Sequence, residues 1–557
     1  MSDASTILQE SFESQEMDYK FEKESWVMVT DSNGLSYSGS QLNYDLSVVC
    51  NGSFVDWDNS FLQVPLQLSV VPVGNIMSPV TNHDNFCASL KQNLLLVNSI
   101  YVSVANCDVV QHANYSGIAC NYKLLSTYSN DKLQTFGSAC GFYKDNSLFA
   151  YNTSGESLGI GECNNCIQLN QVFASNEAYT NYIDNNVNLG RVSRVMQEGG
   201  LDGNGNAGSN ATYAKQTLQD YVVASQSGQN GANAATPDSV VYNLICNIPL
   251  GQMHDFFNKL PLVRGAFVRM QINLNTECAC QVTVNGGGTA YAIYTPQTLH
   301  TVLPYQISPI GTGAQGMILG TPANAVLNTS LKIGNASLNQ TRIWVRQVQL
   351  APEAEKMYLS KLPQKKVCYD EVFSYRFNVG VNSSFNQLIT PSITRLRGML
   401  IVPVIGSNAH VSSSAGGVYA SPLSSPFSSA GATTIMNHQI TNFNVMLGGQ
   451  QWYPQNINYT WQQFLYETDR TGAYGGRQEL TSGLISYSDY VNGMGFVYVD
   501  LQAGADEASD AKSKSVLIQG ICNTATPVAS VDYFVYLFYE KQIDINCSTG
   551  EIVFRRD

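Results

Sequence analysis

A glycine-flanked serine is the first place where this sequence could carry catalysis. Gly155-Glu156-Ser157-Leu158-Gly159 fits the G-x-S-x-G nucleophile elbow, in which a sharp strand-to-helix turn projects the serine hydroxyl. The next residues, Ile160 to Asn165, contain Gly161 and are a poor start for a helix. We therefore interpret Ser157 as a loop residue without a catalytic role.

Three glycines further along have the spacing of a dinucleotide-binding turn. Gly203, Gly205 and Gly208 fit G-x-G-x-x-G, but no apolar strand precedes them. Nothing would then aim a helix dipole at a pyrophosphate, so we predict no nucleotide site.

The same stretch imitates the start of a calcium-binding loop. Asp202, Asn204 and Asn206 could supply oxygen ligands. The sixth position is Ala207 and the twelfth is Tyr213, where such loops place Gly and Glu. We therefore predict no bound cation in this stretch.

Two cysteine pairs could together supply four thiolates to zinc. Cys163 and Cys166 form one pair, and Cys278 and Cys280 form the other. The pairs lie far apart in sequence, and free cysteine also serves as a small core hydrophobe. The total of 13 Cys is odd and no signal peptide is evident, which argues against a disulfide framework.

His254-Asp255 is the one adjacent histidine and carboxylate pair within the short helices that the sequence suggests. Such a pair can transfer protons, but a solvated or helix-capping role is commoner. The sequence thus predicts no catalytic, cofactor-binding or metal-binding residue, no cofactor and no enzymatic activity.

Composition narrows the class of protein further. At 557 residues the chain exceeds the size of one ordinary core, so two domains are expected. The net charge of −13 disfavours a protein that wraps nucleic acid, because phosphate binding needs many Lys and Arg. Only 13% of residues are charged and Tyr (31) outnumbers Phe (22), a balance typical of large buried subunit interfaces.

The amino-terminal segment is acidic and lacks the basic start and apolar stretch of a secretory signal. No stretch reaches the roughly 18–20 apolar residues that span a bilayer. We expect synthesis and folding in the cytosol or nucleus, and the sequence leaves membrane contact open.

Period-2 alternation in short runs indicates an all-β protein. Apolar residues alternate from Leu62 to Val70 and from Val268 to Leu274, and similar runs recur in both halves. Helical periodicity is sparse, with short helices expected at residues 85–98, 251–259 and 460–471. Without a regular βαβ pattern, sandwiches are favoured over a parallel sheet.

A charged stretch with two prolines divides the chain, as a connector between domains would. Two segments dominated by small and polar residues are expected to be long loop insertions. The predicted organisation is an arm at 1–24, a first domain at 25–352 with an insertion at about 185–238, a linker at 353–366, and a second domain at 367–557 with an insertion at about 406–433.

A set of ordered blocks gives the sequence a family resemblance. They include LNYDLSVV, NSFLQVPLQLSV, SLKQNLLLVNSIYVSVANCDVV, CNIPLGQMHDFFNKLPLVRGAFVRMQINLN, SSFNQLITPSITRLRGMLIVPVI and NFNVMLGGQQWYPQNINYTWQQFLYE. Together the blocks span most of residues 25–540 and omit only the two insertions. They resemble the double jelly-roll major capsid proteins of polinton-like viruses, virophages and related eukaryotic DNA viruses.

The resemblance implies two consecutive eight-stranded jelly-roll β-sandwiches with short helices. It further implies a homotrimer, a pseudo-hexagonal capsomer that tiles an icosahedral shell of the virion. Neighbouring capsomers, penton and minor capsid proteins would be its partners, and assembly would occur in the host cytoplasm or nucleus.

Two alternatives stay open. One is a lectin-like or adhesin-type double β-sandwich that binds through its long loops, which glycans on Asn114 or Asn210 would favour. The other is a hydrolase built on β-sandwiches, for which no Ser/His or carboxylate set can be assembled from the sequence.

Overall fold

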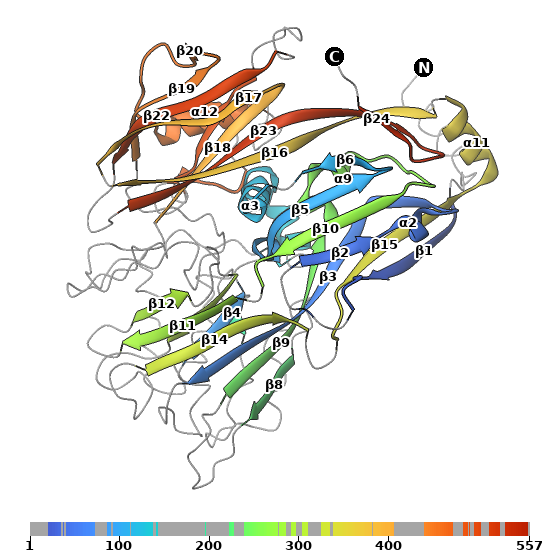
Figure 1. Ribbon diagram of the computed structural model, residues 1–557, viewed down its shortest axis with the longest axis horizontal. Coiled ribbons are helices and arrows are strands. Elements are labelled where there is room, and N and C mark those ends of the chain that lie inside the picture. The colour runs from blue at the N-terminus through green and yellow to red at the C-terminus, as the bar shows by residue number, and fades with distance from the viewer. Residues whose placement is uncertain are drawn as a thin grey trace, which may run out of the picture.

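We analysed a computed structural model of the chain (Figure 1). It describes residues 21–34, 37, 41–72, 86–90, 93–111, 113–137, 141–142, 195–196, 222–227, 239–276, 278–285, 291–296, 304–309, 325–334, 338–361, 363–380, 382–405, 439–471, 483–487, 490, 495–502, 512–523 and 530–554. Among these residues, no helix has the length and apolar character needed to cross a bilayer.

The first half contains a sandwich of eight antiparallel strands in two sheets. One sheet has the order β1-β15-β3-β9 and the other β2-β10-β5-β6. Counted along the chain, these orders are 1-8-3-6 and 2-7-4-5. The strands are β1 (Phe21–Thr30), β2 (Gln41–Asp45), β3 (Phe54–Pro72), β5 (Val97–Val104), β6 (Cys107–Val110), β9 (Ser239–Pro249), β10 (Val268–Leu274) and β15 (Arg342–Leu350).

The second half repeats this topology strand for strand. Its sheets have the orders β16-β23-β18-β21 and β17-β22-β19-β20, which are again 1-8-3-6 and 2-7-4-5. A short strand, β24 (Ile552–Phe554), adds to β23. The eight are β16 (Gln364–Gly380), β17 (Ser384–Ile393), β18 (Leu396–Ile405), β19 (Gln439–Leu447), β20 (Gln450–Gln451), β21 (Val497–Asp500), β22 (Lys514–Asn523) and β23 (Ser530–Asn546).

Additional strands extend the first half at one end, drawn at the bottom of Figure 1. Some prolong the β3 sheet, and the others form a separate three-stranded sheet, β13-β4-β7. Of the insertion expected at 185–238 only β7 and β8 are described, and the one expected at 406–433 lies outside the described residues. The extra strands are β4 (Phe86–Leu90), β7 (Val195–Met196), β8 (Val222–Ser227), β11 (Cys278–Asn285), β12 (Tyr291–Pro296), β13 (Tyr305–Pro309) and β14 (Ala325–Ile333).

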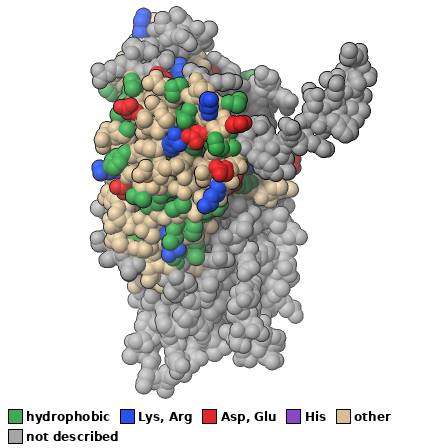
Figure 2. All heavy atoms as spheres, turned by 90° about the vertical axis from the view of Figure 1, so that its right-hand side faces the viewer, with side chains coloured by type: hydrophobic (Ala, Val, Ile, Leu, Met, Phe, Trp, Pro, Cys, Tyr) green, Lys and Arg blue, Asp and Glu red, His purple; other side chains and the backbone are tan. Residues whose placement is uncertain are grey.

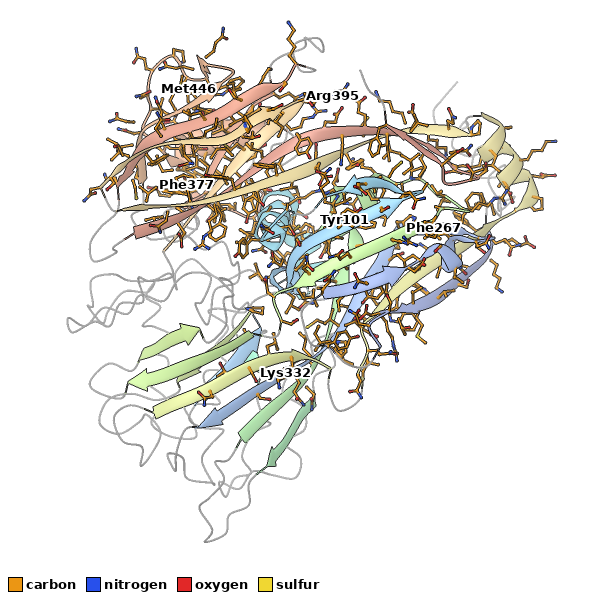
Figure 3. All side chains as sticks on the ribbon, viewed as in Figure 1. Tyr101, Phe267, Lys332, Phe377, Arg395 and Met446 are labelled. Carbon is orange, nitrogen blue, oxygen red and sulfur yellow. The ribbon has the colours of Figure 1, made fainter. Side chains whose placement is uncertain are left out.

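Alternating apolar residues build the core of each sandwich. In β3, Leu62, Val64 and Leu66 all point inward and are fully buried, as the sequence pattern predicts. In the second half, Phe377 of β16 stacks on Tyr533 of β23 with ring centroids 5.2 Å apart (Figure 3). Phe385 of β17, in the other sheet, lies 5.6 Å from the Phe377 ring and 5.4 Å from the Tyr533 ring, so side chains from both sheets fill the space between them.

The helices only partly follow the sequence predictions. The helix expected at 460–471 is confirmed as α12 (Trp461–Thr471), and the one at 251–259 is split at His254 into α8 (Leu250–Met253) and α9 (Asp255–Lys259). The helix expected at 85–98 is wrong, because this range holds β4, the 3-10 turn η2 (Asn93–Leu96) and the start of β5.

Further helices are α2 (Ser47–Cys50), α3 (Ser116–Thr127), α4 (Asn130–Lys132) and the single π turn η3 (Leu133–Gly137). Helix α11 (Pro352–Lys361) lies in the range expected for the linker, and β16 begins soon after it. The domain boundaries themselves stay a prediction.

Candidate functional site at the junction of the two halves

Helix α3 of the first half lies on the outer face of the second half's β16-β23-β18-β21 sheet (Figure 1). The Tyr122 ring meets the Phe496 ring edge-on with centroids 5.1 Å apart, and Tyr115 meets Phe534 in the same way at 5.4 Å. The Tyr536 hydroxyl donates to the carbonyl of Tyr115 at 2.9 Å. This face of the second sheet is therefore buried inside the chain.

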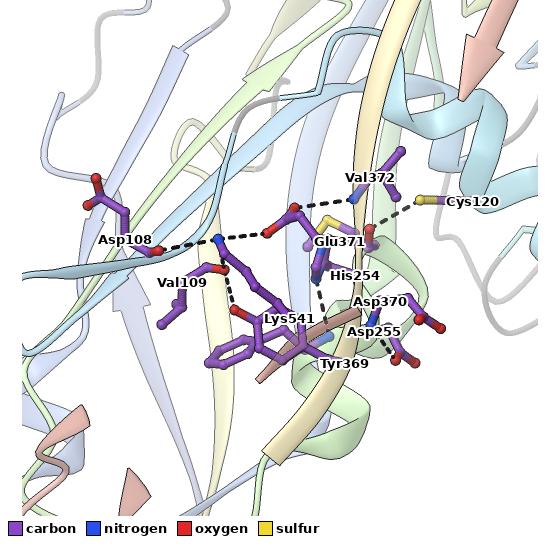
Figure 4. Close-up of polar contacts among 12 residues, drawn as sticks. Asp108, Val109, Cys120, His254, Asp255, Tyr369, Asp370, Glu371, Val372 and Lys541 are labelled. Atoms are coloured by element: carbon purple, nitrogen blue, oxygen red, sulfur yellow. Dashed lines mark hydrogen bonds and ion pairs between the residues drawn. The ribbon is translucent and has the colours of Figure 1, made fainter. Parts of the chain in front are cut away.

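Next to α3 the two halves share a buried polar cluster (Figure 4). Glu371 of β16 accepts from His254 Nε2 at 3.2 Å through Oε1 and pairs with Lys541 Nζ at 3.3 Å through Oε2. The same ammonium donates to the carbonyl of Val109, at 3.1 Å. Glu371 is only 1% exposed, so its charge depends on these partners rather than on water.

His254 has a second role, because it begins helix α9. Its Nδ1 accepts the backbone N–H of Phe256 at 3.1 Å, which satisfies a donor that the helix itself cannot. With Nδ1 engaged as an acceptor, Nε2 is the atom that faces Glu371. The capping role expected from the sequence is confirmed, whereas a solvated one is wrong, since the residue is 8% exposed.

Asp255 forms an ion pair within the first half and also contacts β16 of the second half. Its carboxylate meets Lys123 Nζ of α3 at 3.0 Å and accepts the backbone N–H of Asp370, in β16, at 3.3 Å. Burial raises the pKa of Asp255, but Lys123 and these hydrogen bonds outweigh burial and lower it below its usual value. The adjacent His254 and Asp255 thus hold the first half to β16 through two different partners.

The pKa of Glu371 is shifted in the same direction. Burial raises this pKa, and the interactions of the carboxylate with His254 and Lys541 outweigh burial, so the net shift is downward. Glu371 therefore stays ionised at neutral pH. A fully buried carboxylate already held by two cationic or donating partners cannot reach a substrate. We therefore interpret this cluster as a structural contact between the two halves.

Backbone also meets backbone closely at the far end of the junction. Gly550 has a φ of +69°, and a Cβ added there would lie 2.3 Å from the Cα of Ala266 in the first half. The N–H of Arg264 donates to the carbonyl of Cys547 at 3.0 Å beside it. Only glycine fits this contact.

Gly550→Ala is expected to lower the free energy of unfolding by roughly 2 kcal/mol or more, because it combines positive-φ strain with a backbone clash. Gly34→Ala is the matched control: Gly34 has a φ of +78°, but a Cβ there meets nothing within 4 Å. It should cost about 1 kcal/mol. Denaturant titration of both variants gives the comparison, and equal losses would show that the junction contact adds nothing.

Of the residues that the sequence suggested for chemistry, His254 and Asp255 lie at the junction. Ser157, Cys163, Cys166 and the range 202–213 lie outside the described residues. Within the part of the chain that is described, no three His, Cys, Asp or Glu side chains gather as metal ligands. The zinc, calcium, nucleotide and serine hypotheses therefore stay untested.

Sequence reasoning missed Glu371, Lys541 and Lys123. Glu371 lies 117 residues from His254 and 170 from Lys541, so no local spacing connects them. The sequence does contain one indication of a buried charge. Glu371 lies in a strand in which most of the nearby residues are apolar or aromatic. A charge in such a strand needs a buried partner.

This architecture is similar to that of solved structures. A structure of the Sputnik virophage aligns over 96% of this chain and 89% of that chain at 10% identity, with a TM-score of 0.53. With the strand order repeated in both halves, this decides the fold. The chain is a double jelly roll. The expected fold class of two eight-stranded jelly rolls is confirmed.

Other solved structures align over similar lengths with lower scores. The mavirus major capsid protein covers 95% of this chain and 90% of that chain at 10% identity, with a TM-score of 0.46. The PBCV-1 virus capsid covers 96% and 97% at 9% identity, with a TM-score of 0.43. No protein-family model matches the sequence, and no curated protein does.

Proposed function

We propose that this protein is the major capsid protein of a DNA virus. It forms homotrimers, which are pseudo-hexagonal capsomers that tile an icosahedral shell. The observation that carries the proposal is that two sandwiches of one topology are held side by side by a buried polar junction, in which His254 contacts Glu371, Lys541 contacts Val109 and Asp255 contacts Asp370 across the two halves. The double jelly-roll fold shared with the virophage structure supports it.

Geometry explains why two such halves suit a shell. Each half acts as one wedge, so three chains place six similar wedges around a threefold axis. A block with nearly sixfold outline packs against identical blocks in a plane. The junction must be rigid for this, because a hinge between wedges would let the outline deform.

The remaining parts of the proposal follow from the same role. The protein is structural rather than enzymatic, needs no cofactor and resides in the virion. The division predicted from the sequence, with an arm at 1–24, jelly rolls at 25–352 and 367–557 and a connector at 353–366, remains part of the proposal, and β1 and β16 begin within the last residues of the predicted arm and connector. Neighbouring capsomers, penton and minor capsid proteins are the partners, with no sequence-specific nucleic-acid binding.

Size-exclusion chromatography with light scattering tests the proposal. A chain of 60.8 kDa should elute at three chain masses, 3 × 60.8 or about 182 kDa, at micromolar concentration. Negative-stain images of the same sample should show pseudo-hexagonal particles or plates. A stable monomer at this concentration would overturn the proposal.

A further inference from the structure

The outer sheet faces of the two halves differ in what covers them. In the second half, Tyr536 of β23, Leu400 of β18 and Tyr498 of β21 lie opposite one another in register on the outer face. All are at most 1% exposed, because α3 covers this face. In the described part of the first half, α11 packs on Phe54, Val348 and Leu350 of the corresponding sheet but leaves Trp26 and Met28 exposed.

On the first half, the corresponding outer face carries an aromatic ladder across β1, β15 and β3, which we define as Trp26, Met28, Trp344 and Phe61. Trp26 is 50% and Met28 48% exposed, although their neighbours Val27 and Val29 pack on the core. The Trp26 and Phe61 rings lie 5.7 Å apart, and Phe61 stacks on Trp344 at 6.3 Å. Figure 2 faces this side of the molecule and shows hydrophobic side chains between charged ones.

The helix that covers the second half also has a counterpart. Helix α3 connects the fifth and sixth strands of the first half, β6 and β9, and α12 connects the fifth and sixth strands of the second half, β20 and β21. Whereas Tyr122 of α3 is covered by the second half, Tyr466 of α12 is 50% exposed. Trp461 of α12 meets Tyr487, itself 63% exposed, at 6.1 Å.

Among the described residues, the chain therefore leaves part of a sheet face and one helix exposed, and these correspond to the two members of the interface that it already makes internally. They cannot meet within one chain, because α12 and β1 lie on opposite sides of the molecule (Figure 1). A second copy of the chain could supply a helix to the exposed sheet face and a sheet face to the exposed helix. Contacts of this head-to-tail kind close into a ring when the rotation between copies allows it.

We propose that the exposed aromatic side of α12 docks on the aromatic ladder of a second copy, so that the joint between chains repeats the joint between halves. This inference rests on the proposed trimer and names the surfaces that form it. Aromatic side chains suit such contacts because they bury a large area with little loss of conformational freedom.

Two single substitutions test the two surfaces separately. Trp26→Glu disrupts the surface of the aromatic ladder on which a helix would dock. Tyr466→Glu disrupts the surface of α12 that would dock there. Each places a charge on a surface residue, so circular dichroism should be unchanged. Sedimentation velocity should show that each variant alone has lost the trimer and runs as a monomer. Met357→Glu, at a 59% exposed position on α11, is the control and should remain a trimer.

Mixing the variants gives the sharpest result. The Trp26→Glu chain keeps a working helix and the Tyr466→Glu chain keeps a working ladder, so a mixture should form a one-to-one dimer through the single intact joint. Trimers of both variants, beside a trimeric unmodified protein, would overturn this inference and leave the proposed function standing. Two monomeric variants whose mixture stays monomeric would overturn the head-to-tail pairing. A monomeric unmodified protein would instead overturn the proposed function.

Discussion

Glu371→Leu should lower the free energy of unfolding by about 3–5 kcal/mol, the usual result of breaking a buried ion pair from one side. The substitution leaves Lys541 and His254, which are 3.3 and 3.2 Å from the carboxylate, facing an apolar group. Little water can replace the carboxylate, because the His254 side chain is 6% and the Lys541 side chain 18% exposed. Equilibrium denaturation at neutral pH measures the loss.

An exposed pair provides the control. Glu24 meets Arg346 at 2.8 Å, but its side chain is 45% exposed, so Glu24→Leu should cost no more than about 1 kcal/mol. Combining Glu371→Leu with Lys541→Met should recover part of the loss, because the second change removes the stranded charge. A Glu371→Leu loss as small as the control would mean that the cluster does not hold the halves together.

Tyr122→Ala should destabilise the protein by about 3–5 kcal/mol as well, since a fully buried aromatic ring is replaced by a cavity. The ring lies between the halves, 5.1 Å from Phe496 and 6.0 Å from Tyr498. The cavity therefore opens at the junction rather than inside one sandwich. Denaturant titration gives the energy, and limited proteolysis reports whether the connector near α11 becomes cleavable.

Tyr122→Phe separates packing from polarity. It keeps the ring and removes only the hydroxyl, so its stability should stay within about 1 kcal/mol of the unmodified protein. If the Phe variant were as unstable as the Ala variant, ring packing between the halves would not explain the effect.

The strands could be predicted from the sequence because their signal is local. Leu62 to Leu68 alternate in sequence and point inward in the structure. The failure at residues 85–98 has a physical reason: Leu94, Leu95 and Leu96 form one apolar run that is buried in a 3-10 turn, and a short run does not distinguish helix from turn.

The junction could not be predicted in the same way. Its contacts connect α3, α9, β16 and β23, which lie more than 100 residues apart in sequence. Only the three-dimensional arrangement of the two sandwiches brings Lys123, His254 and Lys541 together. The strand β23 illustrates the difficulty, because residues 531–538 are buried on both faces and therefore show no alternation that reveals an interface.

A three-dimensional reconstruction of the purified particle by cryo-electron microscopy tests the central claim most directly. The account predicts three chains whose six sandwiches surround one axis, with α12 of each chain on the β1-β15-β3 face of the next. Density in which the two halves of a chain occupy non-equivalent positions, or in which the β1-β15-β3 face is open to solvent, would contradict it.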